Sequence, residues 1–176
     1  MSARQDQTEV VLHIGAHRTG TTALQRALDG QTQQLAAVGI AFWGPKELRK
    51  GEFVRKLADL KSASLIEPGS LGARAGIKEP ALPDLPFRRL IVSDENFSGS
   101  MYRNWTQGTL YPEVPPQFRA VLRLLPAPPA AIHFTLRDFA GYWQSVFAHL
   151  QRVRRVPLFE AARLSESLGN SWLPAL

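Results

Sequence analysis

The residues with the clearest chemical potential lie near the N-terminus, where an apolar run meets a short polar loop. Residues 10–14 lead into Gly15, and the chain then passes Gly20, Thr21 and Thr22 before a helical pattern begins. A strand, a tight loop and a helix start direct several backbone N–H groups and a helix dipole toward one anion. The threonine hydroxyls add donors at a helix end where four amides lack intrahelical partners. The pattern therefore predicts an anion-binding loop, and the alternative is an ordinary strand-to-helix turn that contains glycine.

Two carboxylates form a second candidate site, because residues 90–93 predict a strand that runs directly into Asp94 and Glu95. The carboxyl ends of parallel strands open onto the binding crevice, so we expect these side chains beside the loop after Gly15. Three interpretations are open. One carboxylate is a general base that removes a hydroxyl proton; Asp94 binds magnesium, as in a Walker B element; or the carboxylates cap a turn or pair with a basic residue. The magnesium interpretation needs a loop lysine, and Thr21 stands at its position.

An arginine and a serine, eight residues apart, form a third candidate site. Residues 131–136 predict a strand, Arg137 follows it, and Ser145 lies on a helix predicted over residues 139–153. Eight residues carry the chain into the second turn of that helix, so both side chains can reach one group. A phosphate dianion is well bound by a guanidinium fork and a hydroxyl that converge on it. Taken singly, Arg137 would form a surface ion pair and Ser145 would lie on a helix face.

The loop also resembles a known motif. Gly15 and Gly20 have Walker A spacing, but the segment from His17 to Thr22 resembles the 5′-phosphosulfate loop of sulfotransferases. These enzymes take a sulfuryl group from 3′-phosphoadenosine 5′-phosphosulfate (PAPS). Arg18 stands where the family usually has lysine, so the charge is kept and the shape of the cation is not. The resemblance implies PAPS as the donor, no metal, and a set of cofactor-binding residues that comprises His17, Arg18, Thr19, Gly20, Thr21 and Thr22.

The resemblance extends to the other two sites. Residues 93–96 resemble a Ser-x-Glu-Asn stretch of carbohydrate-directed sulfotransferases, which favours Glu95 as the general base and leaves Asp94 second. Arg137 and Ser145 have the spacing of the family's 3′-phosphate site. The resemblance implies sulfuryl transfer to a hydroxyl of a carbohydrate or small molecule, with catalytic roles for Arg18, Glu95 and Asp94.

The resemblance covers roughly residues 10–150. Sulfotransferases usually continue with a basic, glycine-containing segment, and none is found between Arg163 and Leu176, so the chain resembles a short or truncated member. Two other classes of function stay open. One is a non-catalytic module that binds PAPS or its desulfated product, 3′-phosphoadenosine 5′-phosphate (PAP), with a homodimer as one way to complete the site. The other is a P-loop kinase or NTPase, which the missing lysine disfavours.

The elements that must position these residues predict an α/β fold in one domain over residues 1–176. We expect a P-loop-like, three-layer arrangement in which a central parallel sheet is flanked by helices. The acceptor specificity would lie in two loop regions, residues 62–86 and 98–116. The remaining expectations are a polar tail at 1–8, helices at 22–28, 31–38, 47–60 and 117–125, and a strand at 40–43.

The composition narrows the class of protein. The chain has no cysteine, so it has no disulfide framework and no cysteine metal site, and a cytoplasmic location is expected. Its apolar runs are too short to cross a bilayer. The net charge of +6 suits an anionic ligand, and the basic residues are scattered, so we expect no nucleic-acid partner.

Aromatic residues and histidines add few further candidates. His13 and His133 are expected as core or crevice residues. His149 is expected to be packed or exposed, with the lining of an acceptor cleft as the alternative. The tryptophans are expected in the core, with one of them stacking on adenine: Trp43, Trp105, Trp143 and Trp172.

Overall fold

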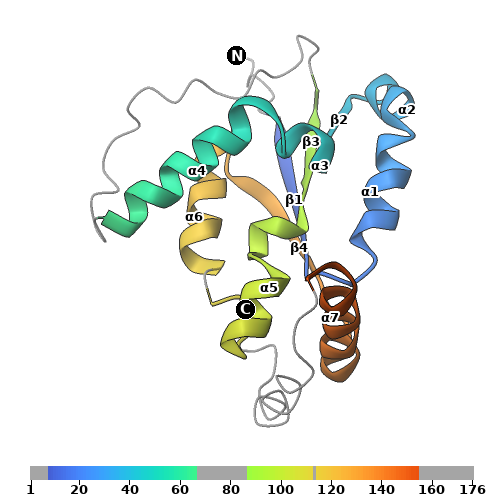
Figure 1. Cartoon of the computed structure of the whole chain (residues 1–176). Coiled ribbons are helices and arrows are strands. Elements are labelled where there is room, and N and C mark those ends of the chain that lie inside the picture. The colour runs from blue at the N-terminus through green and yellow to red at the C-terminus, as the bar shows by residue number, and fades with distance from the viewer. Residues whose placement is uncertain (1–7, 67–86, 113, 155–176) are drawn as a thin grey trace.

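The computed structural model describes residues 8–66, 87–112 and 114–154, and it has the expected α/β class. Four strands form one parallel sheet in the order β2-β3-β1-β4. Figure 1 shows helices on both sides of this sheet, with α4 and α6 on one side and α1 and α2 on the other. The elements are β1 (Glu9–Gly15), α1 (Thr21–Asp29), α2 (Thr32–Ala37), β2 (Ile40–Trp43), α3 (Pro45–Leu48), α4 (Gly51–Ile66), β3 (Arg89–Ser93), the 3₁₀ helix η1 (Glu95–Ser98), α5 (Met101–Gln107), α6 (Val114–Leu124), β4 (Pro129–Thr135) and α7 (Phe139–Arg154).

The main core lies around β1, which pairs with β3 on one side and with β4 on the other. Val10 and Leu12 are fully buried, as are Leu90 and Val92 of β3. A continuous apolar run is typical of a parallel strand that is covered on both faces. Because all four strands run in the same direction, their carboxyl ends meet at one edge of the sheet. The strand order reverses at β1, since β2 and β3 lie on one side of it and β4 lies on the other. Ligands of open parallel sheets bind at such a switch point.

A second core lies between α5 and α7. Trp105 of α5 is tilted against Trp143 of α7 with ring centroids 6.5 Å apart, and Tyr142 is fully buried beside them. Trp43 is buried at the end of β2, so the three tryptophans that the structure describes are core residues, as expected. The fourth, Trp172, lies outside the described residues.

Strand β4 is less covered than the sequence indicates. His13 is buried, as expected, but His133 is exposed, so its expected place in the core or a crevice is wrong. Its neighbour Ile132 is 51% exposed. The physical reason is the strand order: among the described strands, β4 pairs only with β1, and it forms an edge of the sheet.

Several predicted boundaries need correction. The helix expected over residues 47–60 is two helices, α3 and α4, because Gly51 takes a left-handed conformation (φ 69°) that ends one and begins the other. The expected loop at 62–86 starts later, since α4 continues to Ile66, and residues 67–86 lie outside the described part of the chain. The expected loop at 98–116 contains α5 and the first residues of α6. The predicted N-terminal tail ends where β1 begins, and its residues 1–7 are also outside the described part.

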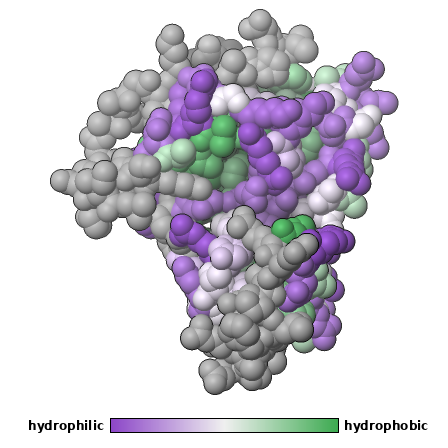
Figure 2. All heavy atoms as spheres, in the orientation of Figure 1, coloured by the Kyte–Doolittle hydropathy of each residue, from purple (hydrophilic) through white to green (hydrophobic). Residues whose placement is uncertain are grey.

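The face of the molecule seen in Figure 2 is mostly polar. Figure 2 shows a largely hydrophilic face on which hydrophobic atoms gather in a few places, one of them beside α4. None of the helices in the described ranges is both long and apolar enough to cross a membrane.

Candidate functional site

The loop after β1 is held in a compact turn by contacts with its own backbone and with β4. The amide of Ala16 donates to the carbonyl of Thr135 at 2.9 Å, and the Thr19 hydroxyl donates to the carbonyl of Ala16 at 2.6 Å. Gly20 has φ 87°, which suits glycine. A side chain at Gly15 would meet the methyl group of Thr21 at 1.9 Å, so glycine is required there as well. The loop therefore leads into the N-terminus of α1 in one defined shape.

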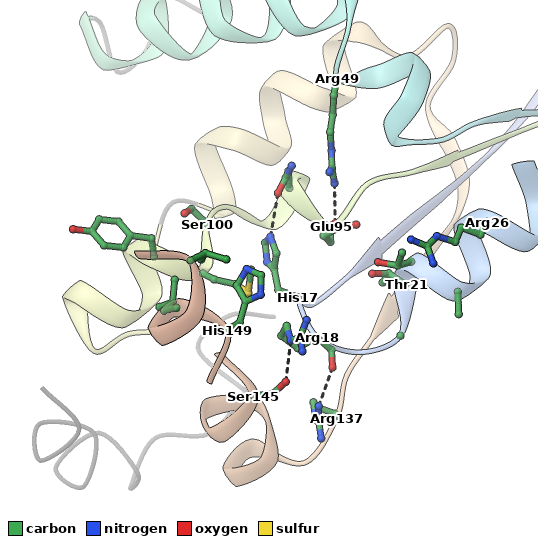
Figure 3. A pocket seen from close by; sticks show the side chains of 18 residues that line it. His17, Arg18, Thr21, Arg26, Arg49, Glu95, Ser100, Arg137, Ser145 and His149 are labelled. Carbon is green, nitrogen blue, oxygen red and sulfur yellow. Dashed lines mark hydrogen bonds and ion pairs between the residues drawn. The ribbon is translucent and has the colours of Figure 1, made fainter. Parts of the chain in front are cut away.

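Arg18 carries the strain of this loop. It has φ 67°, a left-handed conformation that costs a non-glycine residue about 1–2 kcal/mol. Strained residues of this kind cluster at functional sites, where the surrounding structure holds them in place. The Arg18 side chain reaches toward Ser145 of α7 (Figure 3).

A cavity of about 940 Å³ lies at the carboxyl edge of the sheet. It is bounded by the loop, the N-terminal half of α1, Arg49, η1, the start of α5 and residues 145–153 of α7. Figure 3 shows these side chains from close by. The predicted site residues that line the cavity are His17, Arg18, Gly20, Thr21, Thr22, Glu95, Arg137 and Ser145. Two predicted site residues, Thr19 and Asp94, do not line it.

Arg18, Arg137 and Ser145 lie close together, whereas the eight-residue spacing predicted only that Arg137 and Ser145 reach one group. Arg18 Nε donates to Ser145 Oγ at 2.9 Å, and Arg137 Nη1 donates to the backbone carbonyl of Arg18 at 3.0 Å (Figure 3). These contacts join the loop after β1 to the end of β4 and the second turn of α7. Two guanidinium groups and one hydroxyl thus face the same end of the cavity, next to the N-terminus of α1.

Glu95 lies at the opposite end of the cavity with both carboxylate oxygens engaged. Arg49 donates to its Oε1 at 2.8 Å and Gln25 donates to its Oε2 at 3.0 Å. Burial raises the pKa of Glu95, but the hydrogen bonds from Gln25 and Arg49 outweigh burial and leave the pKa below its ordinary value of 4.5. Glu95 is therefore ionised at neutral pH and can accept a proton.

Asp94 serves the structure of this region. Its side chain is 3% exposed and receives two hydrogen bonds from Arg49, at 2.9 and 2.7 Å. It also accepts from the amide of Asn96 at 2.8 Å and so caps η1. These contacts match the capping and ion-pair interpretation for Asp94, whereas Glu95, the next residue, turns into the cavity. Hydrogen bonds to both carboxylates raise the pKa of Arg49 further, so Arg49 is always charged.

His17, which the loop resemblance places among the cofactor-binding residues, is buried. Its backbone amide and its Nδ1 lie 2.8 and 3.0 Å from the hydroxyl of Tyr111, and its Nε2 lies 3.1 Å from the side chain of Asn96. Exchanging the amide oxygen and nitrogen of Asn96 would let it donate to His17 and accept from Arg49. Burial lowers the pKa of His17 below 6.5, so the ring is neutral at pH 7 and contributes no charge to the cavity.

Several lining residues escape prediction from the sequence. Arg26 is one turn after Thr22 on α1, and that i,i+4 spacing was a usable signal. Arg49 gives no signal, because the break between α3 and α4 places it. Met101 and Tyr102 fall in the region that was expected to be a loop. His149 lines the cavity, one turn after Ser145, which fits the alternative given for it.

Comparisons with models of protein families and with the sequences of curated proteins give no match for this chain.

Proposed function

We propose that this protein transfers a sulfuryl group from PAPS to a hydroxyl of a carbohydrate or small-molecule acceptor, on a P-loop-like three-layer fold. One observation carries the proposal: Arg18, Arg137 and Ser145 converge at one end of a cavity that Glu95 enters at the other end. A donor with phosphate groups at both ends of one nucleoside needs two such anion-binding groups within reach of each other. The resemblance of the loop to the 5′-phosphosulfate loop of sulfotransferases supports the same assignment.

The loop and the start of α1 would hold the 5′-phosphosulfate. Backbone N–H groups, the helix dipole and the hydroxyls of Thr21 and Thr22 all favour an anion at this position. Arg18 would stabilise charge on the departing phosphate, since its planar guanidinium can donate two hydrogen bonds at once. Arg137 and Ser145 would hold the 3′-phosphate, which distinguishes this nucleotide from ATP.

Glu95 would act as the general base. In the transfer step the acceptor oxygen forms a bond to sulfur while the bond between sulfur and the bridging oxygen breaks. The electron pair of that bond leaves with the phosphate of PAP, and the acceptor's hydroxyl proton goes to Glu95. Its low pKa keeps Glu95 ionised and ready to accept that proton. The acceptor would lie in the part of the cavity between this carboxylate, the start of α5 and residues 145–153 of α7.

The ion pair between Arg49 and Glu95 favours a second candidate function. A carboxylate stabilised by a guanidinium at 2.8 Å is a weaker base than a free one. The second candidate is a non-catalytic module that binds PAPS or PAP through the same loop and the same pair of arginines. The two candidates share the nucleotide site and differ only in whether Glu95 removes a proton.

Two measurements test these candidates. Calorimetry should show tighter binding of PAP than of ATP with magnesium, and preferential binding of ATP would end the sulfotransferase proposal in favour of a kinase or NTPase. Transfer of radiolabelled sulfate from PAPS to a panel of sugars and phenols should then fall by roughly 10²- to 10⁴-fold in Glu95→Gln.

A matched control is Glu9→Gln, which removes an exposed carboxylate at the other end of β1. PAP affinity should be nearly equal in the wild type and both variants. If the wild type and Glu95→Gln give the same background transfer, the catalytic claim fails and the binding module remains.

A further inference from the structure

A chain of hydrogen bonds runs beneath the cavity, from Glu95 into the middle of the sheet. Gln25 Nε2 lies 3.0 Å from Glu95 Oε2 and 3.2 Å from Ser93 Oγ. The same serine oxygen lies 2.8 Å from Nδ1 of His13, whose Nε2 lies 2.8 Å from Oγ1 of Thr135. The chain thus joins α1 to the three adjacent strands β3, β1 and β4. Of its five members, Glu95 lines the 940 Å³ cavity, and Gln25 and Glu95 line a second cavity of about 230 Å³.

One assignment of donors and acceptors accounts for all of these contacts. The Gln25 amide nitrogen is only a donor, and its two hydrogens go to Glu95 and to Ser93. Because the serine oxygen accepts there, its own hydrogen is free to go to His13 Nδ1. His13 then carries its proton on Nε2 and donates it to Thr135. With His13 neutral and in this tautomer, every hydrogen bond in the chain is satisfied.

Burial as well as hydrogen bonding holds the side chains of this hydrogen-bond series in place. Gln25 is 6% exposed and Ser93 is fully buried. A buried amide without partners costs free energy, so this glutamine is tied to the two oxygens it reaches. Burial and the nearby His133 both lower the pKa of His13, in agreement with the neutral ring.

We propose that Gln25 is a positioning residue for Glu95, and that Ser93 and His13 fix the orientation of its amide. The inference rests on the proposed function, in which Glu95 is the general base. Arg49 holds Oε1 and Gln25 holds Oε2, so the carboxylate cannot rotate without breaking a hydrogen bond on each side. Rigid support beneath a catalytic group is what keeps it within reach of a proton.

The test uses Gln25→Met, which keeps the length of the side chain and removes the donor. The pKa of Glu95, followed by ¹³C NMR of its carboxyl group, should rise, because one hydrogen bond to the ionised form is lost. Gln34→Met, on the exposed face of α2, is the matched control and should leave it unchanged. If Gln25→Met also leaves the pKa of Glu95 unchanged, the positioning role is refuted, whether or not the protein transfers sulfate.

Kinetics separate a positioning role from a merely structural one. In Gln25→Met we expect kcat for sulfuryl transfer to fall on the order of tenfold while KM for PAPS stays the same. The acidic limb of the pH profile of kcat should move to higher pH together with the pKa of Glu95. An equal loss of PAP affinity would indicate general damage to the site and contradict the inference.

Two further measurements keep the inference testable if Gln25→Met does not fold. In the wild type, ¹⁵N NMR of His13 should show a proton on Nε2 and none on Nδ1, and the opposite tautomer would overturn the assigned chain. Gln25→Glu keeps the shape and places a second carboxylate against Glu95, so the pair should share a proton and the pKa should rise. Absence of transfer in the wild type would overturn the proposed function and leave these NMR results unaffected.

Discussion

The two ends of the cavity use arginine in opposite ways. At the loop end, Arg18 donates to the Ser145 hydroxyl and Arg137 donates to a backbone carbonyl, so these hydrogen bonds are made to neutral oxygens. Arg137 Nε also lies 3.8 Å from the carboxylate of Asp138, which is 70% exposed. An ion pair this long and exposed is worth little.

At the carboxylate end, the charges are matched within the protein. Arg49 contacts Asp94 at 2.7 Å and Glu95 at 2.8 Å, and Asp94 is almost fully buried. This difference indicates that the loop end serves binding and the carboxylate end serves stability. An anion gains most at the loop end, whereas breaking the matched charges should cost folding free energy.

Asp94→Ala should have the largest effect on folding. The variant loses the cap of η1 and two hydrogen bonds from Arg49, which together cost about 3 kcal/mol of unfolding free energy. Asp94→Asn keeps an acceptor for the cap, so it should lose roughly half as much. Urea unfolding measures both values. If both variants are as stable as the wild type, the carboxylate end does not carry stability and the contrast between the ends is wrong.

Arg137→Ala should show the reverse pattern, with weaker binding and unchanged folding. Loss of one charge-assisted contact should raise the dissociation constant of PAP roughly ten- to hundredfold. The stability should stay within about 0.5 kcal/mol of the wild type, because the side chain is partly exposed. Arg89→Ala removes a comparable arginine at the far end of β3 and is the control for net charge. Equal PAP affinity in both variants would remove Arg137 from the site.

Local patterns explain why much of the fold was predictable. An apolar run bounded by glycine or by charged residues identifies a buried strand, and residues 40–43 are found as β2 with the expected bounds. The turn after β1 was predictable for the same reason, and so was the passage from β4 into α7, on which Arg137 and Ser145 lie.

Contacts between distant elements explain what the sequence did not show. Arg49 reaches Asp94 and Glu95 only because the chain turns between α3 and α4, and nothing local indicates that turn except Gly51. The different roles of the adjacent Asp94 and Glu95 follow from where η1 begins. The exposure of His133 follows from the strand order, which depends on pairing across the whole sheet.

The smallest expected effect is the pH dependence of stability, to which histidines at both ends contribute. His17 lies in the loop, His149 lies on α7 and His13 lies beneath the carboxylates, and burial lowers the pKa of each below 6.5. The unfolded chain, with histidines at their ordinary pKa, therefore binds more protons than the folded protein as the pH falls below 6.5. Stability is fully present above that pH and is lost as the solution becomes more acidic, by up to about 1.4 kcal/mol per pH unit for each histidine.

Urea unfolding between pH 5.5 and 7.5 measures this slope, in a window that lies above the ordinary pKa of 4.5 for Glu95. His17→Gln should reduce the slope by the contribution of about one proton and leave the contributions of the other histidines. Gln34→Met, at an exposed position on α2, is the control and should keep the wild-type slope. A wild-type stability that does not change over this range would show that none of these histidines is held neutral by burial. A charged His13 would carry a proton on Nδ1 and could not accept from Ser93, so the direction assigned to that hydrogen bond would then be reversed.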